Sequence, residues 1–163
     1  MDQFITSSNS SFNFLKGNSE FLNIVLDNIC NCVLLFDKDM QLRAFNNALK
    51  TLFVNTEDEH LLYKKCGNAI GCAFAIDEEK DCGDTSHCQY CDLREAAMIS
   101  YSEKKPVHRN LFEREFFKID GTKVMKYLNF STRLFYFRKE YYILIIIEDI
   151  SDIIELKKTT NKL

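Results

Sequence analysis

Five of the seven cysteines in this 163-residue chain lie in one short segment, which also contains three of the five glycines. Thiolates gathered this densely either form disulfides with one another or bind a soft metal. Each of the three glycines is next to a cysteine, and glycine lets the backbone turn tightly enough for several sulfurs to face one point. We therefore take these cysteines as the candidate cofactor and metal ligands: Cys66, Cys72, Cys82, Cys88 and Cys91.

The spacing of these cysteines favours an iron–sulfur cluster over zinc. Structural zinc in all-cysteine sites typically uses two Cys-x2-4-Cys pairs. Here only Cys88 and Cys91 form such a pair, and the other gaps contain five, nine and five residues. Uneven spacing that ends in a Cys-x2-Cys pair is closer to iron–sulfur ligation. We expect a [4Fe-4S] or [2Fe-2S] cluster, with zinc as the alternative. Either centre has four coordination positions for cysteine, so one of the five cysteines is not needed as a ligand.

Two metal-free interpretations stay open. The cysteines are either buried free thiols, although their segment is polar and offers little apolar material to bury them, or a redox switch in which a pair such as Cys88 and Cys91 closes a disulfide. His87 is either a nitrogen ligand, a hydrogen-bond donor to a cluster sulfur, or a solvated loop residue. Cys30 and Cys32 alternate across the start of a strand and are assigned to its core or edge.

Composition excludes several classes of function. The net charge is −3 and the basic residues are dispersed, so no nucleic-acid surface is expected. The N-terminus lacks a secretory signal, and the longest apolar run, from Tyr141 to Ile147, is far shorter than the roughly 20 residues of a membrane helix. We expect a cytoplasmic protein, where thiols stay reduced. No phosphate loop, Ser-His-Asp spacing or Glu-x-x-His helix occurs, so we expect no enzyme.

Periodicity predicts an α+β fold that positions the cysteines. Asp120-Gly121 is a strong two-residue hairpin signal between the third and fourth strands. Five antiparallel strands in one sheet, with the middle helices on one face and a helix at each terminus, is the economical packing. The expected elements, in order, are helix 18–28, strands 32–36 and 41–45, a helix capped by Asn46 through Phe53, short helices, helix 92–103, strands 108–119, 122–134 and 141–147, and a last helix opened by an Asp152/Glu155 capping box.

This organisation is one domain between a loose N-terminal lead-in and the end of a C-terminal helix. Residues 1–17 are a loose lead-in, residues 18–157 form the domain with its cysteine-rich insert at 66–91, and residues 158–163 end the C-terminal helix. Both terminal helices carry a narrow apolar stripe, which predicts a homodimer through these helices, with the N-terminal one contributing most of the contact. The sequence names no downstream signalling partner. The stripe residues are Leu22, Val25 and Ile29 in the first helix, and Ile153, Leu156, Thr160 and Leu163 in the last.

Four short motifs occur in the order in which the PAS domain carries them. Asp27–Ile29 followed by Cys32–Asp37 resembles that family's lead-in and first strand, and Leu42–Ala48 resembles its second strand and the helix after it. Asp120-Gly121 is similar to its hairpin turn, and Ile147–Ser151 to its closing Asp-Ile-Thr signature. The resemblance implies a sensory module whose terminal helices transmit a signal.

The cysteine segment lies where a PAS domain carries its ligand-binding helices. Its pattern, Cys-Gly-x3-Gly-Cys followed by Cys-Gly-x4-Cys-x2-Cys and Leu93-Arg94, resembles a cysteine-bearing PAS subgroup of bacterial signalling proteins. That resemblance implies an iron–sulfur or thiol redox sensor. The flavin- and haem-binding types fit poorly, because no cysteine is followed by arginine and helix 92–103 contains no histidine.

Overall fold

The computed structural model of the chain describes residues 19–53 and 61–162. Its centre is one five-stranded sheet in the order β2-β1-β5-β4-β3, in which every neighbouring pair is antiparallel. The predicted lead-in (1–17), the polar segment 55–60 and Leu163 of the C-terminal stripe lie outside the described residues. The strands are β1 (Cys32–Phe36), β2 (Leu42–Phe45), β3 (Val107–Phe117), β4 (Lys123–Phe137) and β5 (Glu140–Asp149).

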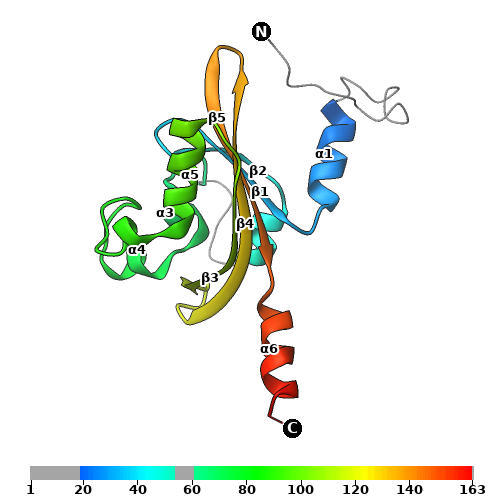
Figure 1. Cartoon of the computed structure of the whole chain (residues 1–163), viewed down its shortest axis with the longest axis vertical. Helices are drawn as coiled ribbons and strands as arrows, with labels where there is room; N and C mark the ends of the chain where they lie inside the picture. Colours follow the sequence, from blue (N-terminus) through cyan, green and yellow to red (C-terminus); the bar gives the residue numbers. More distant parts are fainter. Residues whose placement is uncertain (1–18, 54–60, 163) are drawn as a thin grey trace.

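The helices occupy both ends of the described chain and one face of the sheet. Helices α3, α4 and α5 lie on one side of the sheet, α1 stands on the other side, and α6 extends beyond the end of β5 (Figure 1). The predicted α+β fold is confirmed, with its meander of the last three strands. The helices are α1 (Ser19–Asn28), α2 (Ala48–Leu52), α3 (Cys66–Ile70), α4 (Ala73–Asp77), the 3-10 helix η3 (Cys88–Tyr90), α5 (Asp92–Glu103) and α6 (Ser151–Thr160).

Alternating side chains bury one face of the sheet beneath these helices. In β5, Ile143, Ile145 and Ile147 are at most 1% exposed, while the residues between them are half-buried. Strand β1 repeats the pattern, since its first, third and fifth residues are buried. Because side chains alternate across a strand, this pattern gives the sheet one core face. Helix α5 covers that face with a buried stripe that includes Leu93 and Ala96.

The prediction that Asn46 caps the following helix is wrong. Helix α2 begins two residues later, with Asn47 at its N-cap position and no side-chain cap hydrogen bond. Asn46 is 3% exposed, and its Nδ2 donates to the carbonyl oxygens of Leu26 (2.8 Å) and Asn31 (2.9 Å). Its Oδ1 accepts the Val33 N–H at 2.9 Å. The side chain therefore ties the end of α1 to β1, which satisfies a buried amide that would otherwise be costly.

The β3–β4 turn is longer than the predicted two-residue loop. The Gly121 N–H donates to the Lys118 carbonyl at 3.0 Å, and the Lys118 N–H donates to the Thr122 carbonyl at 2.8 Å. Gly121 has a φ of 82°, in the left-handed region that glycine adopts without strain. Asp120 supports the turn, because its Oδ1 accepts the Thr122 N–H at 2.9 Å. The turn residues were thus correctly identified, but the loop length was not.

The start of α6 is held by a different carboxylate from the one predicted. Instead of an Asp152/Glu155 capping box, Asp149 Oδ1 accepts the N–H of Ser151 at 3.0 Å and its hydroxyl at 2.5 Å. Asp149 Oδ2 also pairs with Lys126 Nζ on β4 at 2.5 Å. Helix α6 therefore begins on a side chain fixed to the sheet. None of the helices in the described part of the chain is long and apolar enough to cross a membrane.

Candidate functional site

All five predicted cysteines line one cavity of about 30 Å³ on the helix-covered side of the sheet. The chain thus brings together thiols that are up to 25 positions apart in sequence. Among residues 19–53 and 61–162, however, no three His, Cys, Asp or Glu side chains form a group ready to hold a metal ion. The rest of the wall is mostly apolar, with two arginines: Met40, Gly67, Ile70, Thr85, Leu93, Arg94, Phe112, Arg114 and Phe116.

The prediction that this segment offers little to bury the cysteines is wrong. Cys66 is 4% exposed and belongs to the hydrophobic core, while the other four cysteines are partly exposed. The segment supplies its own apolar residues, since Ala69 and Ile70 of α3 are buried in the core. Polar composition hid this, because the buried positions occur within five-residue helices that are too short to show a periodic pattern.

A left-handed glycine places Cys72 against the sheet. Helix α3 ends at Gly71, whose φ of 77° reverses the chain, and the Cys72 N–H donates to the Gly67 carbonyl at 2.8 Å. Cys72 then forms an antiparallel bridge with Phe116 of β3, and the Phe117 N–H donates to the Gly71 carbonyl at 2.9 Å. The position of Cys72 is therefore fixed by β3 as well as by α3.

Gly67 allows two cysteines to approach α3 closely. A Cβ atom at this position would lie 3.1 Å from both Cβ and Sγ of Cys82 and 3.2 Å from Cβ of Cys72. Only glycine accommodates these contacts without displacing a cysteine. The Cys82 N–H also donates to Asn68 Oδ1 at 2.8 Å, which holds this loop on α3.

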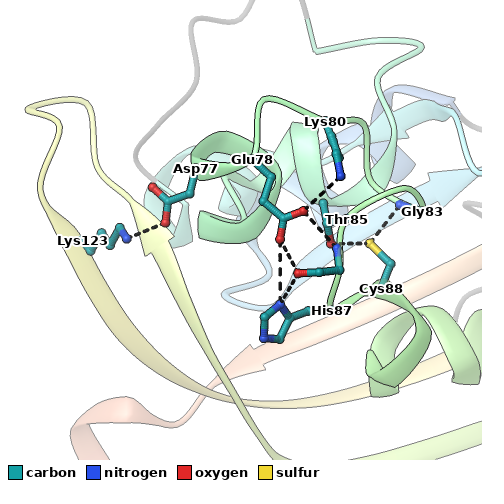
Figure 2. Close-up of polar contacts among 9 residues, drawn as sticks. Asp77, Glu78, Lys80, Gly83, Thr85, His87, Cys88 and Lys123 are labelled. Carbon is teal, nitrogen blue, oxygen red and sulfur yellow. Dashed lines mark hydrogen bonds and ion pairs between the residues drawn. The ribbon is translucent and has the colours of Figure 1, made fainter.

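The sulfur of Cys88 is the most extensively hydrogen-bonded of the five. It accepts the Gly83 N–H at 3.0 Å, and the Thr85 hydroxyl lies 2.9 Å away (Figure 2). Cys91 follows at the N-cap position of α5, where the Glu95 N–H donates to its carbonyl at 2.9 Å. The Cys-x2-Cys pair is thus fixed between a tight loop and the long helix α5.

Burial and hydrogen bonding give the thiols different acidities. Burial raises the pKa of Cys66 well above its usual value and that of Cys82 to about 11, and burial also raises the pKa of Cys72. For Cys88, desolvation acts in the same direction, but hydrogen bonds from Thr85 and Gly83 outweigh it and the pKa is lowered. Without a metal, Cys88 is therefore the thiol of these four that ionises most readily.

Two arginines that the sequence analysis did not assign a role add positive charge to the wall. The guanidinium of Arg94 covers Gly83, where a Cβ atom would lie 2.9 Å from Arg94 Nη1, and it favours the thiolate of Cys88. Arg114 of β3 lies over the rings of Phe74 and Phe112, at 4.9 and 5.1 Å. Its charge offsets part of the rise that burial causes in the pKa of Cys72. The site is thereby suited to anionic sulfur.

His87 lies beside this cavity without lining it. Its ring stacks on Phe74 with a centroid distance of 3.6 Å, and its Nδ1 is 2.9 Å from the Ser86 hydroxyl. Glu78 receives the Ser86 N–H at 3.0 Å and lies 3.7 Å from Lys80 (Figure 2). These contacts make His87 part of an ordered polar surface over α4. Its prediction as a nitrogen ligand gains no support from its position.

The two remaining cysteines lie outside the cavity. Cys32 is fully buried at the start of β1, opposite Ile147 of β5, as predicted, whereas Cys30 is exposed and precedes the strand, so its prediction as a strand residue is wrong. Burial raises the pKa of Cys32 to about 12. Neither residue lines the cavity.

The donor chemistry fits a metal held by thiolates. Five thiols line one cavity, the Gly83 N–H donates to the sulfur of Cys88, and Arg94 and Arg114 line the same wall. Hydrogen bonds to sulfur and nearby charge are the features by which proteins tune iron–sulfur clusters.

Comparison with known proteins identifies the fold. No protein-family model and no curated protein matches the chain. The solved PAS domain of a Colwellia psychrerythraea protein has a TM-score of 0.56 and 10% identity, over 82% of this chain and 97% of that one. The PAS domain of an HTR-like protein from Haloarcula marismortui has a TM-score of 0.53 and 15% identity, over 81% and 96%.

A third solved structure covers almost the whole chain. An RNA-binding light-oxygen-voltage receptor has a TM-score of 0.60 and 12% identity, over 99% of this chain and 40% of that one. Likeness at such identities establishes architecture alone. The five-stranded antiparallel sheet, its helices on one face and the helix after the last strand are those of the PAS fold.

Proposed function

We propose that this chain is a sensory PAS domain that binds an iron–sulfur cluster through its cysteine segment and responds to redox state or oxygen. The observation that carries the proposal is the convergence of five thiols on one cavity whose wall donates backbone hydrogen bonds and carries two arginines. The role is binding and signalling rather than catalysis, in a cytoplasmic setting that keeps the thiols reduced.

The residues around the site have separable tasks in this proposal. The candidate ligands are the five cysteines, with Gly83 and Thr85 stabilising the sulfur charge of Cys88. When bound, an iron–sulfur cluster supplies a redox-active and oxygen-labile centre. Phe112 and Phe116 of β3 exclude water from one side of the cavity.

The chain itself offers a path from the site to the sheet. Cys72 is bridged to β3 and Cys91 begins α5, so a change in how the cysteines are held acts on both elements. Inside the core, the Ser100 hydroxyl of α5 lies 2.7 Å from the hydroxyl of Thr132 on β4, which in turn donates to the Ala96 carbonyl at 3.0 Å. This buried polar contact couples any movement of α5 to the central strands.

Anaerobic purification tests the proposal. We expect brown protein with broad visible absorption, iron and acid-labile sulfide, and bleaching in air. Colourless protein with stoichiometric zinc would contradict it in favour of a structural zinc site, in which the metal replaces missing core. Metal-free protein that reversibly loses two thiols on oxidation would contradict it in favour of a disulfide switch.

Assembly is the second part of the proposal: a homodimer through the terminal helices, which passes the signal to a partner not yet identified. Helix α1 has no buried residue, and Leu22 (56% exposed), Ile24 and Val25 form an apolar surface that its own domain does not cover. The Leu22→Glu substitution is expected to shift the dimer toward monomer, which light scattering measures. Ile119→Glu, at a still more exposed apolar residue (68%) of the β3–β4 turn, is the control and should leave the oligomeric state unchanged.

A further inference from the structure

We propose that the hairpin between β4 and β5 is a docking tip that binds the surface of a bilayer containing anionic lipids. The hairpin lies at the opposite end of the molecule from α6 (Figure 1), so attachment there leaves α6 free. The proposal is independent of the cysteine segment and of any metal. The docking tip consists of four exposed aromatic residues and the two cations of the turn: Phe135, Tyr136, Phe137, Arg138, Lys139 and Tyr141.

The turn holds its two cations in a conformation that neither residue favours. Phe137 pairs with Glu140, so Arg138 and Lys139 form a two-residue loop. Their φ values are 49° and 67°, as the type I′ hairpin turn requires. Such turns prefer Asn-Gly, because larger side chains are strained in the left-handed region. Local stability therefore does not account for this pair, and strain of this kind points to a functional role for the two charges.

Aromatic side chains cover both faces of the same hairpin and stay exposed. Tyr136 is 59% exposed and Phe137 is 53% exposed. Tyr136 lies against Tyr141 at a centroid distance of 4.9 Å, and Phe135 stacks on Tyr142 at 5.8 Å. Because successive side chains of a strand point to opposite faces, these two pairs lie on opposite sides of the hairpin. The aromatic surface therefore surrounds a narrow end and does not line a groove.

Further cations gather around the docking tip. Lys104, which follows α5, lies 5.1 Å above the Tyr141 ring and donates to its hydroxyl at 3.4 Å. The β1–β2 turn is close as well, because it lines a polar cavity of about 390 Å³ together with Lys139 and Glu140. This end is positive, although the chain as a whole carries −3. Its charged residues are Lys38, Arg43, Lys104, Arg138 and Lys139, against Asp37, Asp39 and Glu140.

An anionic bilayer matches this shape and charge. Anionic headgroups attract cations at the membrane surface, and aromatic rings favour the boundary between headgroups and acyl chains. A narrow end with rings on both faces can enter such a deformable surface without a complementary pocket. Proteins that bind single-stranded nucleic acid stack the bases on aromatic rings along a positive groove, whereas the rings here pack on one another across the hairpin. The geometry thus favours lipid over nucleic acid.

Cosedimentation of the full, reduced chain with vesicles tests the proposal. The probes are vesicles of phosphatidylcholine alone and vesicles that also contain about 30% phosphatidylserine, both at about 0.1 M salt. We expect wild-type protein to bind the anionic vesicles at least about tenfold more tightly than the uncharged ones, and to dissociate as the salt concentration rises.

A double substitution in the turn separates binding from folding. Arg138→Asn with Lys139→Gly removes both cations and suits the type I′ turn, so the hairpin stays folded, as circular dichroism can check. Its affinity for the anionic vesicles should fall about tenfold or more, since each cation near the surface contributes to binding. Lys157→Gln with Lys162→Gln removes the same charge from α6 and the residues after it, and this control should bind as the wild type does.

Phe137→Ala tests the aromatic part of the docking tip. Its affinity for the anionic vesicles should fall about fivefold or more, because the ring no longer enters the interface. Ile119→Ala, at an exposed apolar residue of the β3–β4 turn, is the control and should keep wild-type affinity.

Several outcomes would overturn the proposal. Folded wild-type protein that does not bind the anionic vesicles, or that binds both kinds of vesicle equally, would do so. Equal losses in the turn variant and in the α6 control would exclude the hairpin as the binding site. A labelled single-stranded oligonucleotide serves as the competing probe: binding to it that is lost in the turn variant, without any binding to vesicles, would replace lipid by nucleic acid as the partner.

Discussion

The meander of β3, β4 and β5 and the cysteine segment 66–91 are ordered in different ways. The meander has long strands whose alternating side chains bury Phe112, Phe130 and Ile145 to 6% exposure or less. The cysteine segment contains only helices of three to five residues, far below the length that is stable alone. Its order comes from glycine turns, from polar contacts such as that of Asn68, and from thiols gathered around a cavity.

This difference indicates that the sheet provides the stability of the domain and the cysteine segment its candidate function. We expect the sheet to be stable without a cofactor, because burial of apolar surface contributes roughly 25 cal/mol per Å². The cysteine segment contains one buried and four partly exposed thiols, none in a disulfide, and these are the donors that a metal would use. The two regions meet where Cys72 pairs with β3 and Cys91 begins α5.

The largest effect is expected from a core substitution in the meander. Ile145→Ala removes a fully buried side chain of β5, and we expect it to lower the free energy of unfolding by about 2–5 kcal/mol. Urea denaturation followed by circular dichroism measures this. Phe137→Ala, at a 53% exposed position near the β4–β5 turn, is the control and should change stability by less than about 1 kcal/mol. Comparable losses in both variants would show that the sheet is not the stable unit.

Metal removal should act on the other region alone. If the proposed metal orders this segment, treating anaerobically purified protein with a chelator will speed amide hydrogen exchange in residues 61–95. Strands β4 and β5 should exchange at unchanged rates, because apolar side chains of the sheet and of α5 supply most of the core around them. Exchange that rises uniformly through the meander would contradict this division, and would identify the metal as an obligatory part of the whole fold.

The same division decides how much could be predicted from the sequence. The strands and α5 were found because their patterns of burial extend over many residues, and β1 and α5 match their predicted bounds. Helix-capping residues were predicted wrongly from local sequence. Asn46, for example, is a residue type that often caps helices, but its side chain makes long-range hydrogen bonds instead. The five cysteines all line one cavity, and the signals that pointed to this, their density and the adjacent glycines, are local features; their role as ligands stays a prediction.

The parts of the site that escaped prediction depend on tertiary pairing. Arg114 is one charged residue on a strand of alternating polarity, and nothing in its neighbourhood distinguishes it from a solvated side chain. It reaches Phe74 and the cavity only because Cys72 pairs with Phe116 two residues away. Arg94 had a weak signal, since it follows the last cysteine by three residues at the start of α5.

Alanine substitutions at two glycines, one in the meander and one in the cysteine segment, should have smaller effects on stability. Gly121→Ala places a side chain at a φ of 82° with nothing within 4 Å, so we expect a loss of about 1–2 kcal/mol from backbone strain and unchanged metal content. Gly67→Ala adds a Cβ atom 3.1 Å from the Cys82 sulfur in a helix that alanine favours. Its global stability should change less than that of Gly121→Ala, while its metal content falls. Urea denaturation and metal analysis on both proteins separate the effects, and equal metal content in both would refute the role of Gly67.

The smallest effect concerns the acidity of single thiols in reduced, metal-free protein. The Cys88 pKa is lowered, because hydrogen bonds from Thr85 and Gly83 outweigh desolvation, whereas burial raises that of Cys66. Since the thiolate is the form that reacts, iodoacetamide near pH 7.5 should modify Cys88 well before Cys66, as peptide mass spectrometry can follow. Thr85→Val removes the hydroxyl 2.9 Å from the sulfur and should raise the Cys88 pKa, so that its pH–rate curve moves to higher pH by up to about one unit. The curve for Cys66 should not move. If the two thiols react at equal rates, or if Thr85→Val leaves the Cys88 curve in place, the hydrogen bonds do not control this sulfur.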